Sequence, residues 1–595
     1  MKRSRARIRC RLFSRLICLF GLIAVFVSGV GGGPVQAQRA FETDGAAGFQ
    51  VKTLARARSR MVAAANPHAV EAGLAVLRAG GSAVDAAIAA QLVLGLVEPQ
   101  SSGIGGGGFL LHWDERTRRI RAYDGRETAP AAIAPDVFME SGGKPRSFWD
   151  AVTSGESVGV PGLLRMLALA HARHGKLPWR KLLEPAIALA EAGFEVSPRL
   201  NRLLAERGAH RFDTAARAYF FDARGEPRAV GERLANPAYA AVLRQVAEHG
   251  PDALHQGPIA AAIVAAVAGA PARAGKLSLE DVAGYDARER EPVCTTYRQY
   301  RICGMGPPSS GGLATAMTLR LVEPFDLGRA PMNAAALHLI AEAQKLAYAD
   351  RDRWLADPDQ VRIPHGLLDS AYLGQRRRLI DKERARTRAE PGVPPGAVHV
   401  RAGAYATVEI AGTTHLSVVD AAGNAVALTS SVEAGFGSGL MASGFLLNNQ
   451  LTDFSFRTHD AQGRPIANAA GPGKRPRSSM APTIVLDPSG RLFAVLGSPG
   501  GARIPLYVVK TIVALIDWKL DAQSALDLPN FGSRNGPFEL EQDVAGIMTA
   551  LQMRALGHEV RTGYMTSGTH LIVRRQGGWL EGGADPRREG IARGD

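Results

Sequence analysis

The sequence predicts an α/β fold of the α+β kind, in which two stacked sheets lie between layers of helices. Segments of alternating apolar and polar residues, typical of strands, concentrate between about 413 and 496. Apolar residues at helical spacing lie on either side, over about 160–290 and over 505–518. With 67 Gly and 6% aromatic residues among 595, the composition indicates many tight turns and favours this class over an all-β sandwich.

The N-terminal half is predicted to begin with two helices. Pro67 opens the first helix, and Gly80 with Gly81 ends it. Ser82 and Asp85 form a capping box for the second, which is apolar on all sides and therefore buried. In chain order, we expect helix 67–78, helix 82–96, strand 109–113, alternating strands and turns over 115–160, and helices over 160–290.

The C-terminal half is predicted to hold most of the strands. A hairpin and a long helix precede them, and residues 385–404, rich in Arg, Pro and Gly without periodicity, are typical of a linker. Pro505 suits the first turn of a later helix. In chain order, we expect hairpin 291–303, helix 333–355, strands 414–420, 424–431, 443–448, 482–487 and 492–496, helix 505–518, and strand 570–573.

Residues 1–37 have the pattern of a secretory signal peptide. A basic segment ends at Arg15, an apolar run extends from Leu16 to about Val30, and small residues precede a mature start at Gln38. The run is short for a membrane span, although an uncleaved anchor is the alternative. Since no later stretch is long enough to cross a bilayer, we expect an exported protein, periplasmic or secreted, that is free of the membrane once the leader is removed.

The formal net charge of +15 reflects the leader more than the mature protein. The leader carries seven Lys and Arg and no acid, so its removal leaves +8. For a chain of this length +8 is a mild excess, and no pattern of interleaved basic and aromatic residues accompanies it. The sequence therefore gives no indication of nucleic-acid binding.

Two cysteines remain after the leader, and their spacing predicts a disulfide. If residues 291–303 form a hairpin centred on Arg298 and Gln299, Cys294 and Cys303 are directly opposed. Opposed Cβ atoms lie about 4.5–5.5 Å apart, near disulfide reach, and an oxidising compartment favours the bond. Two buried free thiols are the alternative. Without His partners the pair makes a poor metal site, and we expect neither metal nor cofactor.

A glycine-rich segment at 103–108 satisfies the G-x-G-x-x-G pattern of dinucleotide-binding loops. The pattern requires a helix directly afterwards, whereas Phe109 to Trp113 reads as a strand. We therefore expect these glycines to allow close backbone contact beside an active site.

Thr413, in Gly412-Thr413-Thr414, is the candidate nucleophile. If the chain is cut before Thr413, its own α-amine, with a reference pKa of about 7.7–8.0, serves as the base. A mobile linker before it lets the new terminus move clear. Two threonines alone usually mark an ordinary strand, so the surrounding sequence carries the hypothesis.

That surrounding sequence resembles the γ-glutamyltranspeptidase family over nearly the whole chain beyond the leader. The motifs are NPHAVEAGLAVLRAGGSAVDAAIAA, EPQSSGIGGGGF, DGRETAP, PPSSGG, HLIAEAQKLAYADR, TTHLSVVDAAGNAVALTSS, FGSGLMASGFLLNNQLTDFS, GPGKRPRSSMAPTIV and GSPGGARI. The resemblance implies the four-layer αββα sandwich of the N-terminal nucleophile hydrolases. It also implies self-cleavage between Gly412 and Thr413 into a large subunit, 38–412, and a small subunit, 413–595, that remain together as a heterodimer.

The resemblance also implies roles for individual residues. Thr413 attacks the γ-carbonyl of a donor such as glutathione, Ser431 hydrogen-bonds it, and Gly500 and Gly501 stabilise the oxyanion before the acyl group passes to water or an amino-acid or peptide acceptor. The remaining predicted substrate-binding residues are Arg126, Glu433, Gln450, Asp453, Ser478 and Ser479. Arg126 is expected at one end of the donor, and Asp453 and Glu433 at the other.

Three departures from the family pattern concern the acceptor and the substrate. Glu433 and Thr452 stand where many relatives have Asn and an acid, and segment 456–470 lacks the tyrosine of a lid found in some relatives. A missing lid leaves an acyl-enzyme open to water and weakens the expectation of efficient transfer. Two other functions remain open: a glutaryl or cephalosporin acylase of the same fold, and a non-catalytic exported binding protein.

Overall fold

Two seven-stranded sheets form the centre of the protein. The computed structural model describes residues 49–397, 403–404, 412–542 and 546–595. Sheet I contains, in spatial order, β21 (Ile591–Gly594), β2 (Met61–Ala64), β10 (Gly412–Val419), β11 (Ala425–Glu433), β3 (Gly107–Asp114), β4 (Arg119–Gly125) and β7 (Arg288–Arg290). Sheet II contains β1 (Ala55–Ala57), β20 (Leu580–Ala584), β19 (His570–Arg574), β15 (Leu492–Gly497), β14 (Thr483–Leu486), β9 (Tyr300–Gly304) and β8 (Val293–Tyr297).

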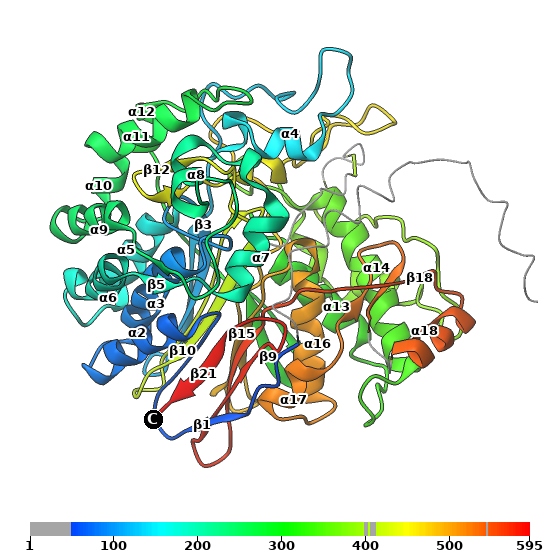
Figure 1. The fold of residues 1–595 in the computed structure, drawn as a ribbon. Helices are drawn as coiled ribbons and strands as arrows, with labels where there is room; N and C mark the ends of the chain where they lie inside the picture. The colour runs from blue at the N-terminus through cyan, green and yellow to red at the C-terminus, as the bar shows by residue number, and fades with distance from the viewer. Residues whose placement is uncertain (1–48, 398–402, 405–411, 543–545) are drawn as a thin grey trace, which may run out of the picture. The chain divides into compact units, whose positions relative to one another are not determined.

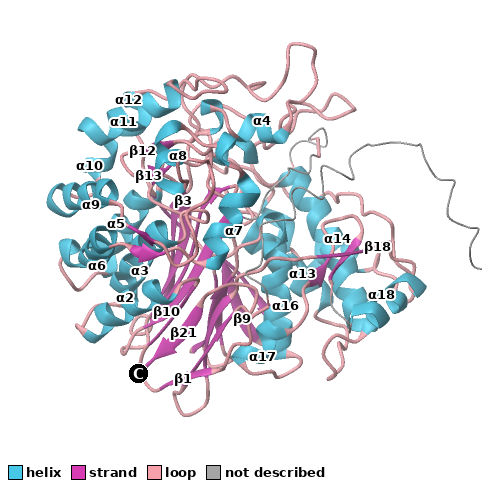
Figure 2. Cartoon of the chain, in the orientation of Figure 1, coloured by secondary structure: helices cyan, strands magenta, loops and turns pink. Residues whose placement is uncertain are grey.

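Helices cover the outer face of each sheet, so the layers run helix, sheet, sheet, helix (Figures 1 and 2). Beside sheet I lie α2 (Pro67–Arg78), α3 (Ala83–Val97) and α5 (Leu163–His174), with α6 (Trp179–Ala192) and α9 (Pro237–His249) behind them. Beside sheet II lie α13 (Gly311–Val322), α16 (Ile504–Ile516) and α17 (Ala522–Asp527), with α14 (Ala334–Trp354) and α15 (Ser370–Arg377) behind them. This arrangement confirms the predicted four-layer sandwich.

Smaller elements complete the described part of the chain. The helices are α4 (Phe148–Val152), α7 (Pro198–Arg207), α8 (Thr214–Phe220), α10 (Asp252–His255), α11 (Gly257–Ala268), α12 (Leu279–Ala283) and α18 (Gly546–Ala555). The strands are β5 (Phe194–Glu195), β6 (Arg233–Leu234), β12 (Met441–Ala442), β13 (Phe445–Leu446), β16 (Phe531–Gly532), β17 (Phe538–Glu541) and β18 (Val560–Gly563). Short 3₁₀ turns are η1 (Gly155–Ser157), η2 (Ala209–Arg211), η3 (His365–Leu368), η4 (Gln450–Asp453) and η5 (Gly501–Arg503).

Strand β10, which carries the predicted nucleophile, lies inside sheet I rather than at its edge. It pairs antiparallel with β11 along its whole length, with Thr413 opposite Ser431, and with β2 from Leu416 to Val419. Its inner face packs on β15 and β19 of sheet II. Thr413 is therefore at the start of a strand that is anchored on both sides a few residues later.

The predicted strand 443–448 is wrong. The chain forms only the two-residue strands β12 and β13 there, paired as a hairpin outside both sheets. Ser443 and Gly444 at its turn have φ of 47° and 88°, and this left-handed backbone cannot continue a strand. The expected alternation of strands and turns over 115–160 is wrong beyond β4, because α4 and η1 follow and no further strand forms among these described residues. The remaining expected helices and strands that fall on described residues are confirmed, with ends shifted by a few residues.

The glycine-rich segment before β3 makes close backbone contacts, as expected, and no helix follows it. A Cβ on Gly105 would lie 2.1 Å from the Leu446 carbonyl oxygen, and one on Gly106 would lie 2.2 Å from the Ser431 carbonyl oxygen. Glycine is required because these distances exclude any side chain. The segment therefore packs directly against the backbone of β11. Because a strand and not a helix follows it, the nucleotide-binding alternative is excluded.

The two predicted subunits are not separate domains. Sheet I combines β2, β3, β4 and β7 from before Thr413 with β10, β11 and β21 from after it, and sheet II is mixed in the same way. The described residues accordingly all belong to one compact unit. The predicted signal peptide, and residues 398–402 of the linker predicted over 385–404, lie outside the described residues; no described helix is both long and apolar enough to span a membrane.

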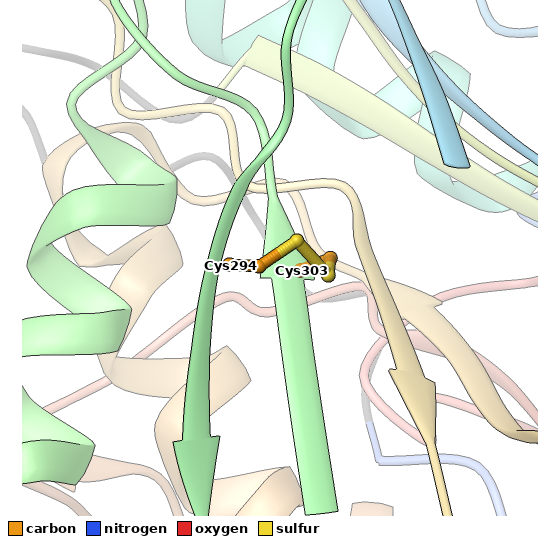
Figure 3. Close-up of a disulfide and its surroundings, with 2 residues drawn as sticks. All are labelled: Cys294 and Cys303. Atoms are coloured by element: carbon orange, nitrogen blue, oxygen red, sulfur yellow. A yellow bond between two sulfur atoms is a disulfide. The ribbon is translucent and has the colours of Figure 1, made fainter. Parts of the chain in front are cut away.

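A disulfide joins the hairpin of β8 and β9 at the edge of sheet II. Cys294 and Cys303 are direct partners in the strand register, and their Cα atoms are 4.1 Å apart (Figure 3). The turn uses Arg298 and Gln299, both with positive φ, as a two-residue hairpin requires. The bond therefore closes a short loop on an edge strand that has a neighbour on one side only.

Replacing both cysteines by serine should lower the free energy of unfolding by about 2–3 kcal/mol at most, because a short loop limits the entropy gained by the unfolded chain. Denaturant melts of the oxidised protein, the reduced protein and the double variant measure the effect. The first should be the most stable and the other two alike. Equal stability of all three, or thiol labelling of both cysteines in denatured, unreduced protein, would contradict the prediction.

Candidate active site

One cavity gathers nearly all the residues that the sequence singled out. It measures about 240 Å³ out to its open mouth. Its lining comprises Arg126, Thr413, Ser431, Glu433, Gln450, Asp453, Ser478, Ser479, Met480, Gly501 and Ile504. Of the predicted residues, Gly412 and Gly500 do not line it, but each directly precedes one that does. Met480 and Ile504 were not predicted.

Thr413 lines this cavity and takes part in a chain of hydroxyl contacts. Its Oγ1 is 3.1 Å from Ser431 Oγ, and Ser431 Oγ is also 3.1 Å from the Gly412 carbonyl oxygen. The Glu433 backbone N–H donates to Ser431 Oγ at 2.8 Å. Ser431 has a single hydroxyl proton, which it donates in a hydrogen bond either to the Gly412 carbonyl oxygen or to Thr413 Oγ1. When Ser431 donates to the carbonyl oxygen, the Thr413 hydroxyl can donate to Ser431.

The residues on either side of this chain have constrained backbones. A Cβ on Gly412 would lie 2.2 Å from the Glu433 carbonyl oxygen, so only glycine fits before Thr413. Glu433 itself ends β11 with φ of 79°, an unusual conformation for a residue with a long side chain. Asn449 Nδ2 donates to Glu433 Oε2 at 2.6 Å and holds the carboxylate at the cavity. Such backbone strain concentrates at functional sites.

Arg126 and Asp453 form a buried ion pair, which corrects the expectation that they face opposite ends of a donor. Arg126 Nη2 donates to Asp453 Oδ2 at 2.5 Å, and neither side chain is more than 6% exposed. Gln450 Nε2 donates to the same oxygen at 2.9 Å. A cation and an anion thus lie side by side at one end of the cavity, where they neutralise one another.

Glu127 lies behind this pair and was not predicted. It is fully buried, its nearest charged partner is Arg126 Nη1 at 3.7 Å, and neither carboxylate oxygen has a hydrogen-bond donor among the described residues. Burial raises the pKa of Glu127 to about 8, although the Arg126 guanidinium lowers it. Glu127 is therefore mostly protonated at neutral pH, and Asp453 is left as the charged partner of Arg126.

The two serines of the site are carried by a tightly held loop. Arg126 donates to the carbonyl oxygens of Pro476 and Arg477, directly before Ser478. From the other side, the hydroxyls of Ser309 and Ser310 donate to the carbonyl oxygens of Met480 and Ser478 at 2.5 and 2.6 Å. The PPSSGG motif therefore positions the serine loop, a role that its sequence did not indicate.

Gly500 and Gly501 lie in the turn that follows β15. Both have positive φ, at 139° and 54°, and the aromatic ring of Tyr507 would lie 2.5 Å from a Cβ on Gly500. Glycine is therefore required at 500 for two reasons, conformation and space. The turn brings Gly501 to the cavity and begins η5.

Three further residues support the site without lining it. Arg588 and Asn449 were not predicted, and the contact of Arg588 joins parts of the chain that are far apart in sequence. Arg588 donates to the Thr413 carbonyl oxygen at 3.1 Å. Asn449 holds Glu433, and Thr452 accepts from Asn449 Nδ2 at 3.0 Å. Thr452, which replaces an acid of the family pattern, therefore acts behind the cavity wall. Among the described residues, no group of three or more His, Cys, Asp or Glu could hold a metal ion.

Comparison with known proteins shows that this chain is similar to one family over most of its length. The family model for gamma-glutamyltranspeptidase matches residues 69–594. The chain is 37% identical to the glutathione hydrolase proenzyme of Escherichia coli K12, covering 89% of this chain and 91% of that protein, and 35% identical to the acylase ACY 1 proenzyme of Pseudomonas sp. SE83, covering 89% and 92%. The crystal structure of cephalosporin acylase from Bacillus halodurans superposes with a TM-score of 0.79 at 28% identity, over 91% of this chain and 97% of that one.

The raised pKa of Glu127 predicts a specific pH dependence of stability. Between its ordinary value of 4.5 and about 8, the folded protein keeps a proton that the unfolded chain has lost. Folded protein thus binds more protons, so its free energy of unfolding falls as pH rises through this window, by at most about 1.4 kcal/mol per pH unit. Glu127→Gln removes this contribution and should flatten the fall.

Denaturant melts of wild type, Glu127→Gln and the exposed control Glu140→Gln at pH 5, 6, 7 and 8 measure it. The stability of Glu127→Gln relative to wild type should increase with pH, whereas that of the control should not. Parallel curves for wild type and Glu127→Gln would show that the carboxyl ionises normally.

Proposed function

The chain belongs to the gamma-glutamyltranspeptidase family, and on this premise we propose that it is a γ-glutamyltransferase and glutathione hydrolase that cleaves itself before Thr413. The observation that carries the proposal is the single cavity in which Thr413, the Arg126–Asp453 pair and the Ser478–Ser479 loop meet. A nucleophile, charged groups that hold a substrate and a glycine turn with backbone N–H groups for an oxyanion are parts that acyl transfer needs.

Self-cleavage comes first. The Thr413 hydroxyl attacks the Gly412 carbonyl carbon, and the acyl group moves from the Thr413 nitrogen to its oxygen. Water then hydrolyses this ester, which releases the Gly412 carboxylate and leaves Thr413 with a free α-amine. Ser431 supports this step, because its hydroxyl lies within hydrogen-bond distance of both the attacking oxygen and the carbonyl oxygen under attack.

Donor turnover uses the same oxygen. The Thr413 α-amine accepts the hydroxyl proton while the oxygen attacks the γ-carbonyl, and the amine then gives the proton to the leaving nitrogen. Gly500 and Gly501 are proposed to supply backbone N–H groups to the oxyanion. The γ-glutamyl-threonine ester passes to water or to the amine of an amino acid or peptide. Segment 456–470 has no tyrosine, so hydrolysis is expected to compete strongly with transfer.

The Arg126–Asp453 pair supports a donor with an amino-acid head. Such a head carries a carboxylate and an ammonium on one carbon, so its partners must be neighbours. Binding exchanges one ion pair for two, with Arg126 on the carboxylate and Asp453 on the ammonium, and leaves no charge unpaired. Glu433 and Gln450 supplement the ammonium side, and Ser478 and Ser479 supplement the carboxylate side.

An acylase acting on glutaryl groups is the second candidate, because acylases are among the relatives. A glutaryl donor offers the same chain length but no ammonium. Its carboxylate would take Arg126 from Asp453 and leave the aspartate buried without a cation, which is costly. The donor comparison below separates the two activities, and a protein that never cleaves itself would support the third alternative, a non-catalytic binding protein.

Export into an oxidising compartment, periplasmic or extracellular, completes the proposal. The predicted leader of residues 1–37 and the Cys294–Cys303 disulfide both favour it. Residues 38–412 and 413–595 are proposed to remain together after cleavage, because they share both sheets.

Thr413→Ala should remain one chain and be inactive, because it lacks the oxygen that both reactions use. Thr414→Ala is the matched control: its buried hydroxyl makes no hydrogen bond among the described residues, and it should still be cut and active. Intact mass and release of an anilide from a γ-glutamyl donor are the measurements. Two fragments from Thr413→Ala in protease-free preparations would overturn the mechanism.

Wild type should use γ-glutamyl anilide at least about a hundredfold better than glutaryl anilide in kcat/KM, since sites built around a polar group reject analogues that lack it. Asp453→Asn should remove most of this preference by slowing the γ-glutamyl reaction. Asp460→Asn, an acid outside the cavity that pairs with Arg464, should keep the preference. Equal or faster turnover of the glutaryl compound by wild type would establish the acylase instead.

A further inference from the structure

We propose that Arg351 is a positioning residue for donor binding: it orients the Ser479 hydroxyl so that its proton points at the donor's α-carboxylate. This inference rests on the proposed function, since it assigns a device by which the same cavity selects a carboxylate. Arg351 lies in α14 and does not line the cavity itself.

The contacts of Arg351 place it directly behind the serine loop. Its Nη2 donates to Ser479 Oγ at 2.6 Å, and its Nε donates to Ser310 Oγ at 2.9 Å. Nη1 pairs with Asp352 at 2.8 Å, and the side chain is 2% exposed. The planar guanidinium therefore holds two serines from adjacent segments in one fixed geometry.

The direction of the Ser479 hydroxyl follows from what arginine can do. A guanidinium has five donors and no acceptor, so Ser479 Oγ must accept in this contact. The positive charge attracts the oxygen and repels the hydroxyl hydrogen, which turns away from Arg351. Because Ser479 also lines the cavity, its hydroxyl is left to donate there.

Ser478 is oriented in the same sense by a backbone donor. The Met480 N–H donates to Ser478 Oγ at 3.1 Å, so this oxygen also accepts inside the loop and retains its proton for the cavity. Two hydroxyl donors and the Arg126 guanidinium thus share one cavity. Three donors close together favour an anion, and hydrogen bonds to a charged group are the stronger kind.

Arg351 also fixes where the loop lies. Ser310, which accepts from Arg351 Nε, donates through its own hydroxyl to the Ser478 carbonyl oxygen at 2.6 Å. One side chain therefore sets the polarity of Ser479 directly and the position of Ser478 through Ser310. Lysine keeps the charge but lacks the fork, and cannot hold both serines in this arrangement.

The test compares two ligands that differ only in the α-carboxylate. L-Glutamate has it, and 4-aminobutyrate is the same chain and ammonium without it. By calorimetry on the purified protein, Arg351→Lys should weaken L-glutamate binding about tenfold, the loss of one hydrogen bond to a charged group, and change 4-aminobutyrate binding less than about twofold. Arg353→Lys, the same substitution two residues along α14, should change neither.

A double variant tests whether Arg351 acts through Ser479. Ser479→Ala should weaken L-glutamate binding by a similar factor. Arg351→Lys added to Ser479→Ala should weaken it by clearly less than it does alone, because only its effect on the Ser478 position remains. Ser310→Ala retains Arg351 and loosens its second contact, so it should give a smaller loss of the same kind. This milder variant keeps the test decisive if Arg351→Lys fails to fold.

Equal losses for both ligands, or full additivity with Ser479→Ala, would overturn the inference and leave Arg351 with a structural role only. In kinetics with a γ-glutamyl anilide, Arg351→Lys should raise KM and change kcat little. Failure of the proposed function looks different: wild type would then bind L-glutamate yet release no anilide, while the binding comparison still tests Arg351.

Discussion

The position of β10 inside sheet I is the constraint on which the rest of the structure depends. A nucleophile that uses its own α-amine must be the first residue of a chain, and chain ends are ordinarily the least ordered part of a protein. Here the residues that follow Thr413 are hydrogen-bonded to β11 at once and to β2 from Leu416 onward. Arg588 holds the Thr413 carbonyl oxygen as well. The terminus created by cleavage would therefore be held by a complete sheet.

Cutting a chain in the middle of a shared sheet also explains how the two pieces can stay together. Both sheets combine strands from before and after Thr413, and helices from both parts cover sheet II. Separating the pieces would expose the apolar cores of both sheets to water and leave strand edges unpaired, and both effects are unfavourable in free energy. The paired strands β10 and β11 hold the unusual backbone of Glu433 and the close contact at Gly412 in place.

Inside the cavity, the direction of the hydrogen bonds determines which side chains can donate to a bound ligand. Ser431, Ser478 and Ser479 each accept one hydrogen bond from a group that can only donate: two backbone N–H groups and a guanidinium. Each serine therefore keeps its own proton available for a second hydrogen bond. Arg126 and Asp453 neutralise one another until a ligand of matching, opposite charges arrives. Binding then replaces existing interactions rather than satisfying bare buried charges, which keeps an empty site compatible with a stable fold.

Most of the fold could be predicted from the sequence because the signals are local. Helical spacing, glycine and proline stops, and the hairpin that opposes Cys294 and Cys303 are all properties of short segments. Segment 443–448 is an exception: its apolar pattern suits a strand, but its turn at Ser443 and Gly444 breaks it. Segment 126–160 is another, since it forms α4 and η1 where strands were expected. Long motifs identified the site residues, and the fold then brings those residues together around one cavity.

What the sequence alone determined was therefore the order of the elements, the candidate nucleophile and the residue types around it. Only the tertiary structure decided that Arg126 and Asp453 are direct partners rather than opposite ends of a site, and that Glu127 is buried beside them. It likewise decided that Arg351 contacts Ser479 and that Arg588 contacts the Thr413 carbonyl oxygen. The physical reason is that these contacts join residues up to several hundred positions apart. Their hydrogen-bond directions and burial arise only when two sheets and their helices pack together.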